Sequence, residues 1–563
     1  MKCFIFIIFI LLSTVLHGQG VKFEAEDAIL EGVNKASSRS GFSGTGYVTG
    51  FDKATDKVTF NFSWEKAGIY QLYIGFASPN GDKKNYVIVN GQTLGEVLFA
   101  STSKFKELDA GKIYLTNGAN SIAIAHSWGW FEVDYIRIDE VKPSTEWNIS
   151  PTPVNPNVTP EALSMYQYLL NNFGKTTFAG QFQSDGKLYN ESNSEIRFLK
   201  DLTGKYPAVY GNDLINYTPS RVENGATTKA TEDILKWYKE RNGMVTLTWH
   251  WNAPTDLYNT AEQPWWKGFY TTATSFDIGW VMNNPDSEKY QLILRDIDTI
   301  AKQLKIYQQN NIPILWRPLH EAEGAWFWWG AKGPEACKKL WILLYDRLTN
   351  YHKINNLIWV WTTTDSNKAS DWYPGDQYVD ILGVDVYLQA GDYSVSSAMF
   401  DNLRNIFGGR KMLTMSENGT LPDPDMMNQM DAKWLYVCTW VGDFIFDGKN
   451  NSTDHINSFF NHNEVTTLDE LPTYWLRYTR NVEVKKPIGA KLSPNPVNDC
   501  LLIEFDNNNE ENSVAIIDSA GKIIMEEKGT KQIEFNTMHL KKGFYMAKIT
   551  GKNSSNTYKF IKK

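Results

Sequence analysis

Cysteine and long apolar runs are scarce in this sequence. Four of its 563 residues are cysteines. Cys3 stands before an apolar N-terminal run, which leaves Cys337, Cys438 and Cys500 for the rest of the chain. Three widely spaced thiols do not make a disulfide framework, so we expect them to be mostly buried and unreactive. After the N-terminal run no stretch has the roughly 18 uninterrupted apolar residues of a membrane-spanning helix, so the mature chain is expected to have none.

Basic residues are also fewer than acidic ones. The chain has 56 Lys and Arg against 64 Asp and Glu, a net charge of −8 and a pI near 5.7. Nucleic acids and anionic membranes are bound through clustered basic residues, and no such cluster occurs here. Neither is therefore expected as a partner.

The ends of the chain differ from its middle. Residues 1–18, MKCFIFIIFILLSTVLHG, have one early Lys, an apolar run and then small or polar residues, which is typical of a secretory signal peptide. Residues 21–140 alternate short strand-like runs with turn residues, which predicts a β-sandwich of the jelly-roll kind. Residues 141–160 contain five prolines and read as a linker. Short strand-like runs return at 488–563 and predict a small C-terminal β-sandwich.

Aromatic residues are abundant, at 14% of the chain with 21 Trp and 28 Tyr. Such abundance fits either carbohydrate binding or several aromatic-rich cores. Residues 161–478 alternate apolar runs with helical patterns, such as the one at 290–306. This alternation predicts a (β/α)₈ TIM barrel. Its eight expected strands are 176–181, 208–213, 244–251, 312–321, 357–363, 378–387, 411–417 and 434–440.

Polar and aromatic residues stand where the expected barrel strands end. Active sites of such barrels lie at the carboxyl ends of the strands, so these side chains should share one mouth. Glu321 and Glu417 are 96 positions apart, or about three βα units, which places them on opposite sides of the barrel. The residues in question are His250, Glu321, Asp385, Tyr387, Glu417 and Trp440.

Two carboxyl groups across a cleft are the machinery of glycoside hydrolysis, in which one protonates the leaving oxygen and the other attacks the anomeric carbon or activates water. A divalent-metal site is the alternative. It would need more His or Asp ligands, and HEAEG at 320–324 is not HExxH because position 324 is Gly. We therefore expect no cofactor in catalysis.

Several motifs occur together in a recognisable order: RPLHE at 317–321 followed by Trp326, GVDVY at 383–387 and SENG at 416–419. Over roughly 160–475 they resemble glycoside hydrolase family 26, whose best-known members are retaining endo-β-1,4-mannanases acting on mannan, galactomannan or glucomannan. The resemblance implies that Glu321 is the general acid/base and Glu417 the nucleophile. Mixed-linkage β-glucan or xylan as substrate, an exo enzyme releasing mannobiose, and a non-catalytic glycan-binding protein remain open.

The types of the neighbouring residues suggest their roles. A partly buried setting beside Trp326 would raise the pKa of Glu321, whereas donors such as Tyr387 and Arg317 would favour an ionised Glu417. Double displacement predicts carboxyl groups about 5–5.5 Å apart. The expected substrate-binding residues of the barrel are His250, His320, Trp326, Tyr387 and Trp440.

The first segment begins FEAEDA and ends FEVDYIRI. It resembles carbohydrate-binding module family 35. The resemblance implies a structural Ca²⁺ held by Glu24, Glu26 and Asp134, with carboxylates on the surface of two terminal strands as the alternative. Trp128 is the expected sugar-stacking residue of the module.

The last segment contains LSPNPVND (492–499), IIDSAGKII (516–524) and LKKGFYMAKI (540–549). It resembles the sorting domains of the type IX secretion system. The resemblance implies export through that machinery to the medium or the cell surface. An accessory sandwich without a role in export is the alternative.

Overall fold

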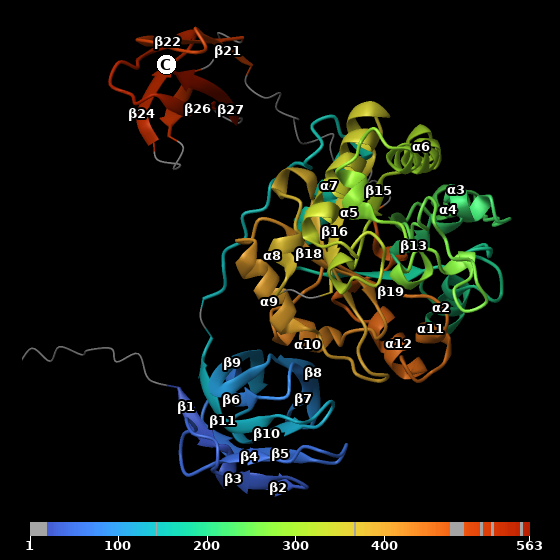
Figure 1. The fold of residues 1–563 in the computed structure, drawn as a ribbon, viewed down its shortest axis with the longest axis vertical. Coiled ribbons are helices and arrows are strands. Elements are labelled where there is room, and N and C mark those ends of the chain that lie inside the picture. The colour runs from blue at the N-terminus through green and yellow to red at the C-terminus, as the bar shows by residue number, and fades with distance from the viewer. Residues whose placement is uncertain are drawn as a thin grey trace, which may run out of the picture. The chain divides into compact units, whose positions relative to one another are not determined.

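The structure is a computed structural model that describes residues 20–141, 143–364, 367–472, 489–506, 511–518, 523–551 and 555–563. The chain divides into two compact units, Met1–Tyr478 and Thr479–Lys563. Figure 1 shows the N-terminal strands in blue, the barrel from green to orange and the C-terminal strands in red. The predicted signal peptide, 1–18, lies outside the described residues.

The N-terminal module is a sandwich of two antiparallel sheets, as predicted. Along β5 (Lys57–Trp64), Val58 and Phe60 are buried and their neighbours are not, which is the alternation of a strand with one face on a core. One sheet contains β1 (Val21–Glu24), β3 (Asn34–Ala36), β4 (Tyr47–Thr49), β6 (Gly68–Ser78), β9 (Thr102–Leu115) and β11 (Glu132–Glu140). The other contains β2 (Ile29–Glu31), β5, β7 (Lys83–Val89), β8 (Gln92–Phe99) and β10 (Gly118–Ala125).

The proline-rich segment after β11 lies against the barrel. Its described residues up to Thr159 form no helix or strand. The ring of Trp147 meets that of Phe400 edge-on at 6.0 Å, and the amide of Asn148 donates to the carbonyl of Gly409 at 2.8 Å. The segment predicted as a linker is therefore held by aromatic packing and backbone hydrogen bonds.

Eight parallel strands form a closed barrel, which confirms the predicted fold class. Closure comes from the parallel pairing of the first strand with both the second and the last. The strands are buried along nearly their whole length, as a sheet covered on both faces requires. In order they are β12 (Thr177–Phe182), β13 (Val209–Asp213), β14 (Met244–Thr248), β15 (Ile314–Arg317), β16 (Leu357–Thr363), β17 (Ile381–Val386), β18 (Met412–Asn418) and β19 (Tyr436–Thr439).

Helices cover the barrel (Figure 1). The longest, α6 (Glu288–Gln309), begins where the hydroxyl of Ser287 accepts from the amide of Tyr290, and it buries one apolar face. The helix predicted at 335–350 is α7 (Pro334–Tyr345), which continues into a π-helical turn over Asp346–Tyr351. The other α-helices are α1 (Pro160–Asn172), α2 (Glu195–Thr203), α3 (Pro219–Val222), α4 (Ala230–Arg241), α5 (Ile278–Met282), α8 (Ala369–Trp372), α9 (Ser397–Ile406), α10 (Pro424–Gln429), α11 (Asp443–Phe446) and α12 (Thr453–Phe460).

The C-terminal unit is a second, smaller sandwich, also as predicted. One sheet contains β21 (Ala490–Ser493), β22 (Cys500–Phe505) and β25 (Gln532–Asn536). The other contains β23 (Asn512–Ile517), β24 (Ile523–Gly529), β26 (Gly543–Thr550) and β27 (Ser555–Lys562).

The burial of the cysteines largely agrees with the prediction from the sequence. Cys337 and Cys438 are buried free thiols, whereas Cys500 is partly exposed. Among the described helices, none combines the length and the apolar character needed to cross a membrane.

Candidate active site

Glu321 lies just beyond strand β15, in a turn of unusual backbone conformation. The strand ends at Arg317 because Pro318 follows, and the predicted strand to residue 321 is therefore too long. Leu319 and Glu321 have φ of 50° and 54°, values that non-glycine residues rarely adopt. Between them, the carbonyl of His320 accepts from Nε1 of Trp329 at 2.9 Å. Such strain is retained where surrounding contacts impose it, which is common at functional sites.

The carboxyl group of Glu321 is placed to carry a proton near neutral pH. Glu321 is buried, and its Oε2 accepts from Nε1 of Trp326 at 2.8 Å. Burial and the charge of Glu417 raise the pKa of Glu321 to about 7, although the Trp326 hydrogen bond acts in the opposite direction. A carboxyl group with this pKa can both give and take a proton.

Glu417, near the end of β18, is held by two donors. Nη2 of Arg317 donates to its Oε2, and the hydroxyl of Tyr387 donates to its Oε1. The side chain of Glu417 is only 5% exposed, so these contacts fix its orientation in a largely dry setting. Donors on both oxygens satisfy an ionised carboxylate rather than a protonated one.

Arg317 joins three strands through one guanidinium group. Nη1 donates to Oδ2 of Asp385 on β17 at 2.6 Å, while Nη2 reaches Glu417 on β18. Burial lowers the pKa of Arg317, but Asp385 and Glu417 together raise it above its ordinary value, so it stays charged. The other oxygen of Asp385 accepts from the hydroxyl of Ser416 at 2.9 Å. Asp385 therefore sits at the site as a partner of Arg317.

The two predicted histidines face each other. Nε2 of His320 lies 3.1 Å from Nε2 of His250. Nδ1 of His250 lies 2.6 Å from Oδ2 of Asp213, and Nδ1 of His320 lies 3.2 Å from Oγ1 of Thr248. All four ring nitrogens thus have partners within the chain, and a sugar hydroxyl would have to replace one of them. Asp213 was missed by the sequence analysis, although it ends β13 as the other site residues end their strands.

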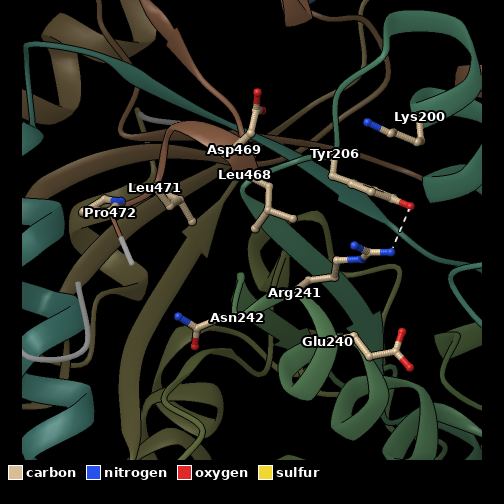
Figure 2. Close-up of a pocket in the computed structure, with 9 residues that line it drawn as sticks. All are labelled: Lys200, Tyr206, Glu240, Arg241, Asn242, Leu468, Asp469, Leu471 and Pro472. Carbon is tan, nitrogen blue, oxygen red and sulfur yellow. Dashed lines mark hydrogen bonds between the residues drawn. The ribbon is translucent and has the colours of Figure 1, made fainter. Parts of the chain in front are cut away.

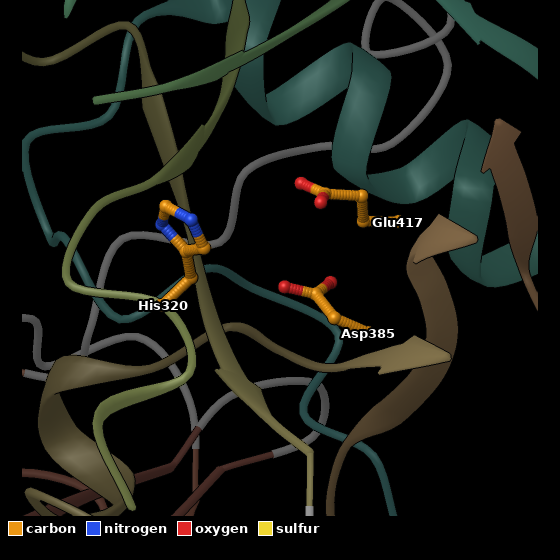
Figure 3. Close-up of side chains that lie close together, drawn as sticks. All are labelled: His320, Asp385 and Glu417. Carbon is orange, nitrogen blue, oxygen red and sulfur yellow. The ribbon is translucent and has the colours of Figure 1, made fainter. Parts of the chain in front are cut away.

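Ligand atoms of His320, Asp385 and Glu417 lie within 4.8 Å of one another. Figure 3 shows the imidazole and the two carboxyl groups turned toward a common space. The guanidinium of Arg317, however, already pairs with both carboxylates. A divalent cation here would lie beside a fixed positive charge, so the donor set does not fit a metal ion.

Two aromatic residues, Trp326 and Tyr387, contact the carboxylates, and a third, Trp440, packs beside His250. Trp326 and Tyr387 are 41% and 43% exposed, which leaves ring surface free for a ligand. Trp440 follows β19 and packs against Phe182 at 4.8 Å and His250 at 5.6 Å. Exposed aromatic rings beside a buried acid suit the apolar faces of sugar rings.

A surface hollow of about 460 Å³ lies elsewhere on the barrel (Figure 2). It is formed by the carboxyl ends of α2 and α4, which lead into the amino ends of strands β13 and β14. This is the end of the barrel opposite to Glu321 and Glu417, where residues serve stability. The hollow is lined by Lys200, Tyr206, Glu240, Arg241, Asn242, Leu468, Asp469, Leu471 and Pro472.

In the N-terminal module, three carboxylates converge on the loop at 43–46. Ser43 donates through its hydroxyl to Glu24 and through its amide to Asp134, while the amides of Thr45 and Gly46 donate to Oε1 of Glu26. Glu26 and Asp134 are 3% and 2% exposed, so they are not the surface carboxylates of the alternative interpretation.

This carboxylate cluster fits a hard cation. Oε2 of Glu26 is buried without a hydrogen-bond partner among the described residues. Burial and the charges of Glu24 and Glu26 raise the pKa of Asp134 to about 6. An unpartnered oxygen and mutual repulsion are what a bound Ca²⁺ would relieve.

The loop between β10 and β11 presents two indole rings. Trp128 and Trp130 are 67% and 60% exposed, so neither belongs to the core. Asn85 is fully buried, and its Oδ1 accepts from the amides of Ser127 and Gly129 at 3.0 and 2.9 Å. The loop that carries Trp128 is therefore anchored by hydrogen bonds to a buried side chain.

The barrel and its paired carboxylates define a glycoside hydrolase of the TIM-barrel class. Residues 154–470 match the model of glycosyl hydrolase family 26, and the chain belongs to that family. Residues 21–141 match carbohydrate binding module family 35, and residues 491–563 match the secretion system C-terminal sorting domain. All three resemblances seen in the sequence are confirmed.

Curated relatives share most of the chain. A mannan endo-1,4-beta-mannosidase of Thermothelomyces thermophilus is 42% identical over 449 residues, covering 80% of this chain and 90% of its own. Mannan endo-1,4-beta-mannosidase B of Piromyces sp is 35% identical over 477 residues, covering 84% and 80%.

Solved structures of beta-mannanases also match this chain. A GH26-CBM35 beta-(1,4)-mannanase of Podospora anserina has 41% identity and a TM-score of 0.59, covering 81% of this chain and 99% of its own. A beta-mannanase from a symbiotic protist of the termite Reticulitermes speratus, solved with gluco-manno-oligosaccharide, has 33% identity and a TM-score of 0.52 and covers 58% and 99%.

Proposed function

We propose that this protein is a secreted, retaining mannan endo-1,4-β-mannosidase that hydrolyses mannan, galactomannan or glucomannan. The observation that carries the proposal is the contrast between two buried carboxyl groups of one site. Glu321 has a pKa raised to about 7, whereas both oxygens of Glu417 accept from charged or hydroxyl donors. Two carboxyl groups held in different protonation states by their surroundings are the acid and the nucleophile of a glycosidase.

In the first half of the reaction, Oε of Glu417 attacks the anomeric carbon while Glu321 gives its proton to the glycosidic oxygen. The glycosidic bond breaks, the shortened chain leaves with that proton, and an ester joins the sugar to Glu417. Arg317 and Tyr387 aim the attacking carboxylate. In the second half, Glu321 takes a proton from water, whose oxygen displaces Glu417 from the same carbon and restores the starting configuration.

Mannan is the proposed substrate because the relatives that cover most of the chain are mannan endo-1,4-beta-mannosidases. Trp326, Tyr387 and Trp440 are proposed to bind sugar rings beside the carboxylates. His250 and His320, which the sequence also predicted to bind substrate, have every ring nitrogen engaged within the chain, so we propose that they support the site rather than bind sugar hydroxyls. An enzyme that acts on mixed-linkage β-glucan or xylan would use the same catalytic pair. An exo enzyme that releases mannobiose would differ only in loops that block one end of the cleft.

The N-terminal module is proposed to bind the polysaccharide through Trp128. Glu24, Glu26 and Asp134 would hold a structural Ca²⁺, which supplies positive charge to three converging carboxylates. The barrel needs no cofactor in this scheme, because the proton donor and the nucleophile both come from side chains.

Export is proposed to use both ends of the chain. Residues 1–18 would direct the protein out of the cytoplasm, and residues 491–563, which match a secretion sorting domain, would engage the type IX machinery. The mature protein would then be released or attached at the cell surface, where polysaccharide is found.

The test is a hydrolysis panel of mannan, galactomannan, glucomannan, lichenan and β-1,3-xylan with analysis of product length. A mixture of mannooligosaccharides appearing early from mannan supports the endo-mannanase. Mannobiose as the sole early product identifies the exo enzyme instead. Binding of mannan without release of reducing sugar would overturn the proposal in favour of a non-catalytic binding protein.

A further inference from the structure

Asp213 is linked to the proposed catalytic site through His250 rather than through Glu321 or Glu417. It is the last residue of β13, and its side chain is 14% exposed. Oδ2 lies 2.6 Å from Nδ1 of His250, and Oδ1 accepts from the amides of His250 and Ile215 at 3.1 and 2.9 Å. Both oxygens are therefore committed to holding His250 and the start of the following loop.

The proton positions along this chain of groups follow from their partners. A carboxylate only accepts, so Nδ1 of His250 carries a hydrogen. The hydroxyl of Thr248 donates its single hydrogen to the carbonyl of Arg317 at 3.2 Å. Its oxygen must therefore accept from Nδ1 of His320. Burial and the charge of Arg317 lower the pKa of His320 well below its ordinary value, so this ring is neutral and its Nε2 bears a lone pair.

That lone pair faces Nε2 of His250 at 3.1 Å. Two bare nitrogens at this distance would repel each other, so Nε2 of His250 must carry a hydrogen as well. His250 is then an imidazolium that donates to Asp213 on one side and to His320 on the other. The charged groups acting on it are Asp213, Glu417, Arg317 and Glu321, and the neutral ring of His320 faces it as well. Burial lowers the pKa of His250, but Asp213 outweighs that effect and raises it above the ordinary value.

The ring that His250 fixes belongs to the residue before the acid. His320 is fully buried, and the residues on either side of it, Leu319 and Glu321, both have positive φ. Such a turn persists only when neighbouring contacts impose it. The ring is held by His250 and Thr248, and the carbonyl is held by Trp329.

We propose that Asp213 is a positioning residue that keeps His250 as an imidazolium, and that this imidazolium locks the His320 ring and with it the turn carrying Glu321. The inference rests on the proposed function in that it takes Glu321 as the acid. It adds Asp213, which acts through His250 and is not proposed to contact a sugar.

The experiment compares wild type with Asp213→Asn, which keeps the size of the side chain and removes its charge. With ¹⁵N-labelled histidine, a His250→Gln spectrum identifies the His250 signals among the eight histidines. Wild-type His250 is expected to keep both ring protons to higher pH than an ordinary imidazole, and the variant to lose one proton at lower pH than the wild type does. The variant's kcat on mannan should fall roughly 10- to 100-fold with little change in KM, as expected for a misplaced acid. Aryl mannosides with good leaving groups should lose much less, because they need no proton.

Asp298→Asn is the matched control. It breaks another Asp–His pair of the barrel with the same 2.6 Å separation, that of Asp298 with His352. This variant should leave the mannan-to-aryl ratio unchanged. Thermal unfolding checks that each variant folds. If Asp213→Asn does not fold, Thr248→Val removes the acceptor of His320 and should show the same selective loss on mannan.

A singly protonated His250 in the wild type at pH 6, or an equal loss on both substrates, would overturn the proposal. The ¹⁵N result does not depend on substrate. Absence of any hydrolysis by the wild type would therefore refute the proposed function while leaving the state of His250 to be read separately.

Discussion

Nε1 of Trp326 donates a hydrogen bond to Oε2 of Glu321 at 2.8 Å, so an indole ring that is 41% exposed also contacts a buried carboxyl group. The bond opposes the effect of burial and of Glu417 on the pKa of Glu321. Under the proposed function Trp326 would therefore have two separable roles, as a surface for a sugar ring and as a hydrogen-bond donor to Glu321.

Trp326→Phe keeps an aromatic ring and removes the donor. Because the lost hydrogen bond lowers the pKa of Glu321, the pKa of about 7 should rise in the variant. The protonated acid then persists to higher pH, so the alkaline limb of the kcat/KM profile on mannan should move upward. Trp280→Phe, which changes a tryptophan on α5 that is 50% exposed, should leave that limb in place. A downward shift in Trp326→Phe would contradict the assignment of this limb to Glu321.

Glu417→Ala removes the proposed nucleophile. Turnover of mannan should fall by about 10³-fold or more, while polysaccharide binding by the N-terminal module persists. Added azide should restore turnover of an activated aryl β-mannoside and yield the α-mannosyl azide, because it attacks from the face that Glu417 leaves empty. Chromatography and NMR of the product provide the measurement. Near-normal hydrolysis by this variant would refute the role of Glu417.

Glu321→Ala removes the proposed proton donor. Substrates with poor leaving groups need that proton and those with activated aryl groups do not, so hydrolysis of mannan should suffer far more than cleavage of the aryl glycosidic bond. Comparing the first-step rates on both substrates by rapid mixing checks this. An equal loss on the two would count against the acid role.

Arg317→Met tests the buried ion pairs. The change leaves Asp385 and Glu417 without their shared guanidinium partner, and breaking a buried pair in this way costs about 3–5 kcal/mol of the free energy of unfolding. Urea unfolding of the variant should show that loss. As a comparison, Arg197→Met breaks the exposed pair with Asp201 and should cost about 0–1 kcal/mol. Similar losses in the two variants would show that the buried pairs do not stabilise the barrel.

The carboxylate cluster of the N-terminal module predicts a dependence of stability on pH and calcium. Asp134 has its folded pKa raised to about 6, so without metal its effect favours folding at low pH and is lost as pH rises through about 6. In a chelator, the Tm of the module should therefore fall over that range. Calcium, which binds the ionised cluster, should raise Tm most above pH 6. Calorimetry at several pH values measures both effects, and a Tm indifferent to calcium at pH 7 would exclude the proposed ion.

The fold was predictable because the apolar strands and the helix patterns of the barrel are local in sequence. The end of β15 could have been predicted from Pro318, whereas the turn at 319–321 could not, since it depends on contacts from other strands. The rule that polar residues at strand ends share the barrel mouth would have found Asp213 if it had been applied to β13. That Arg317 pairs with both Asp385 and Glu417 could not be read from spacing, because it depends on how three side chains pack.

The stereochemistry of hydrolysis tests the account most directly. Proton NMR can follow the anomeric signal of the newly formed reducing end during the first minutes of mannan or mannooligosaccharide cleavage. If Glu417 forms an ester with the sugar and water displaces it, the β-anomer must appear first, with the α-anomer growing in later by mutarotation. Initial formation of the α-anomer would mean a single displacement by water and would contradict the assignment of Glu417 as nucleophile.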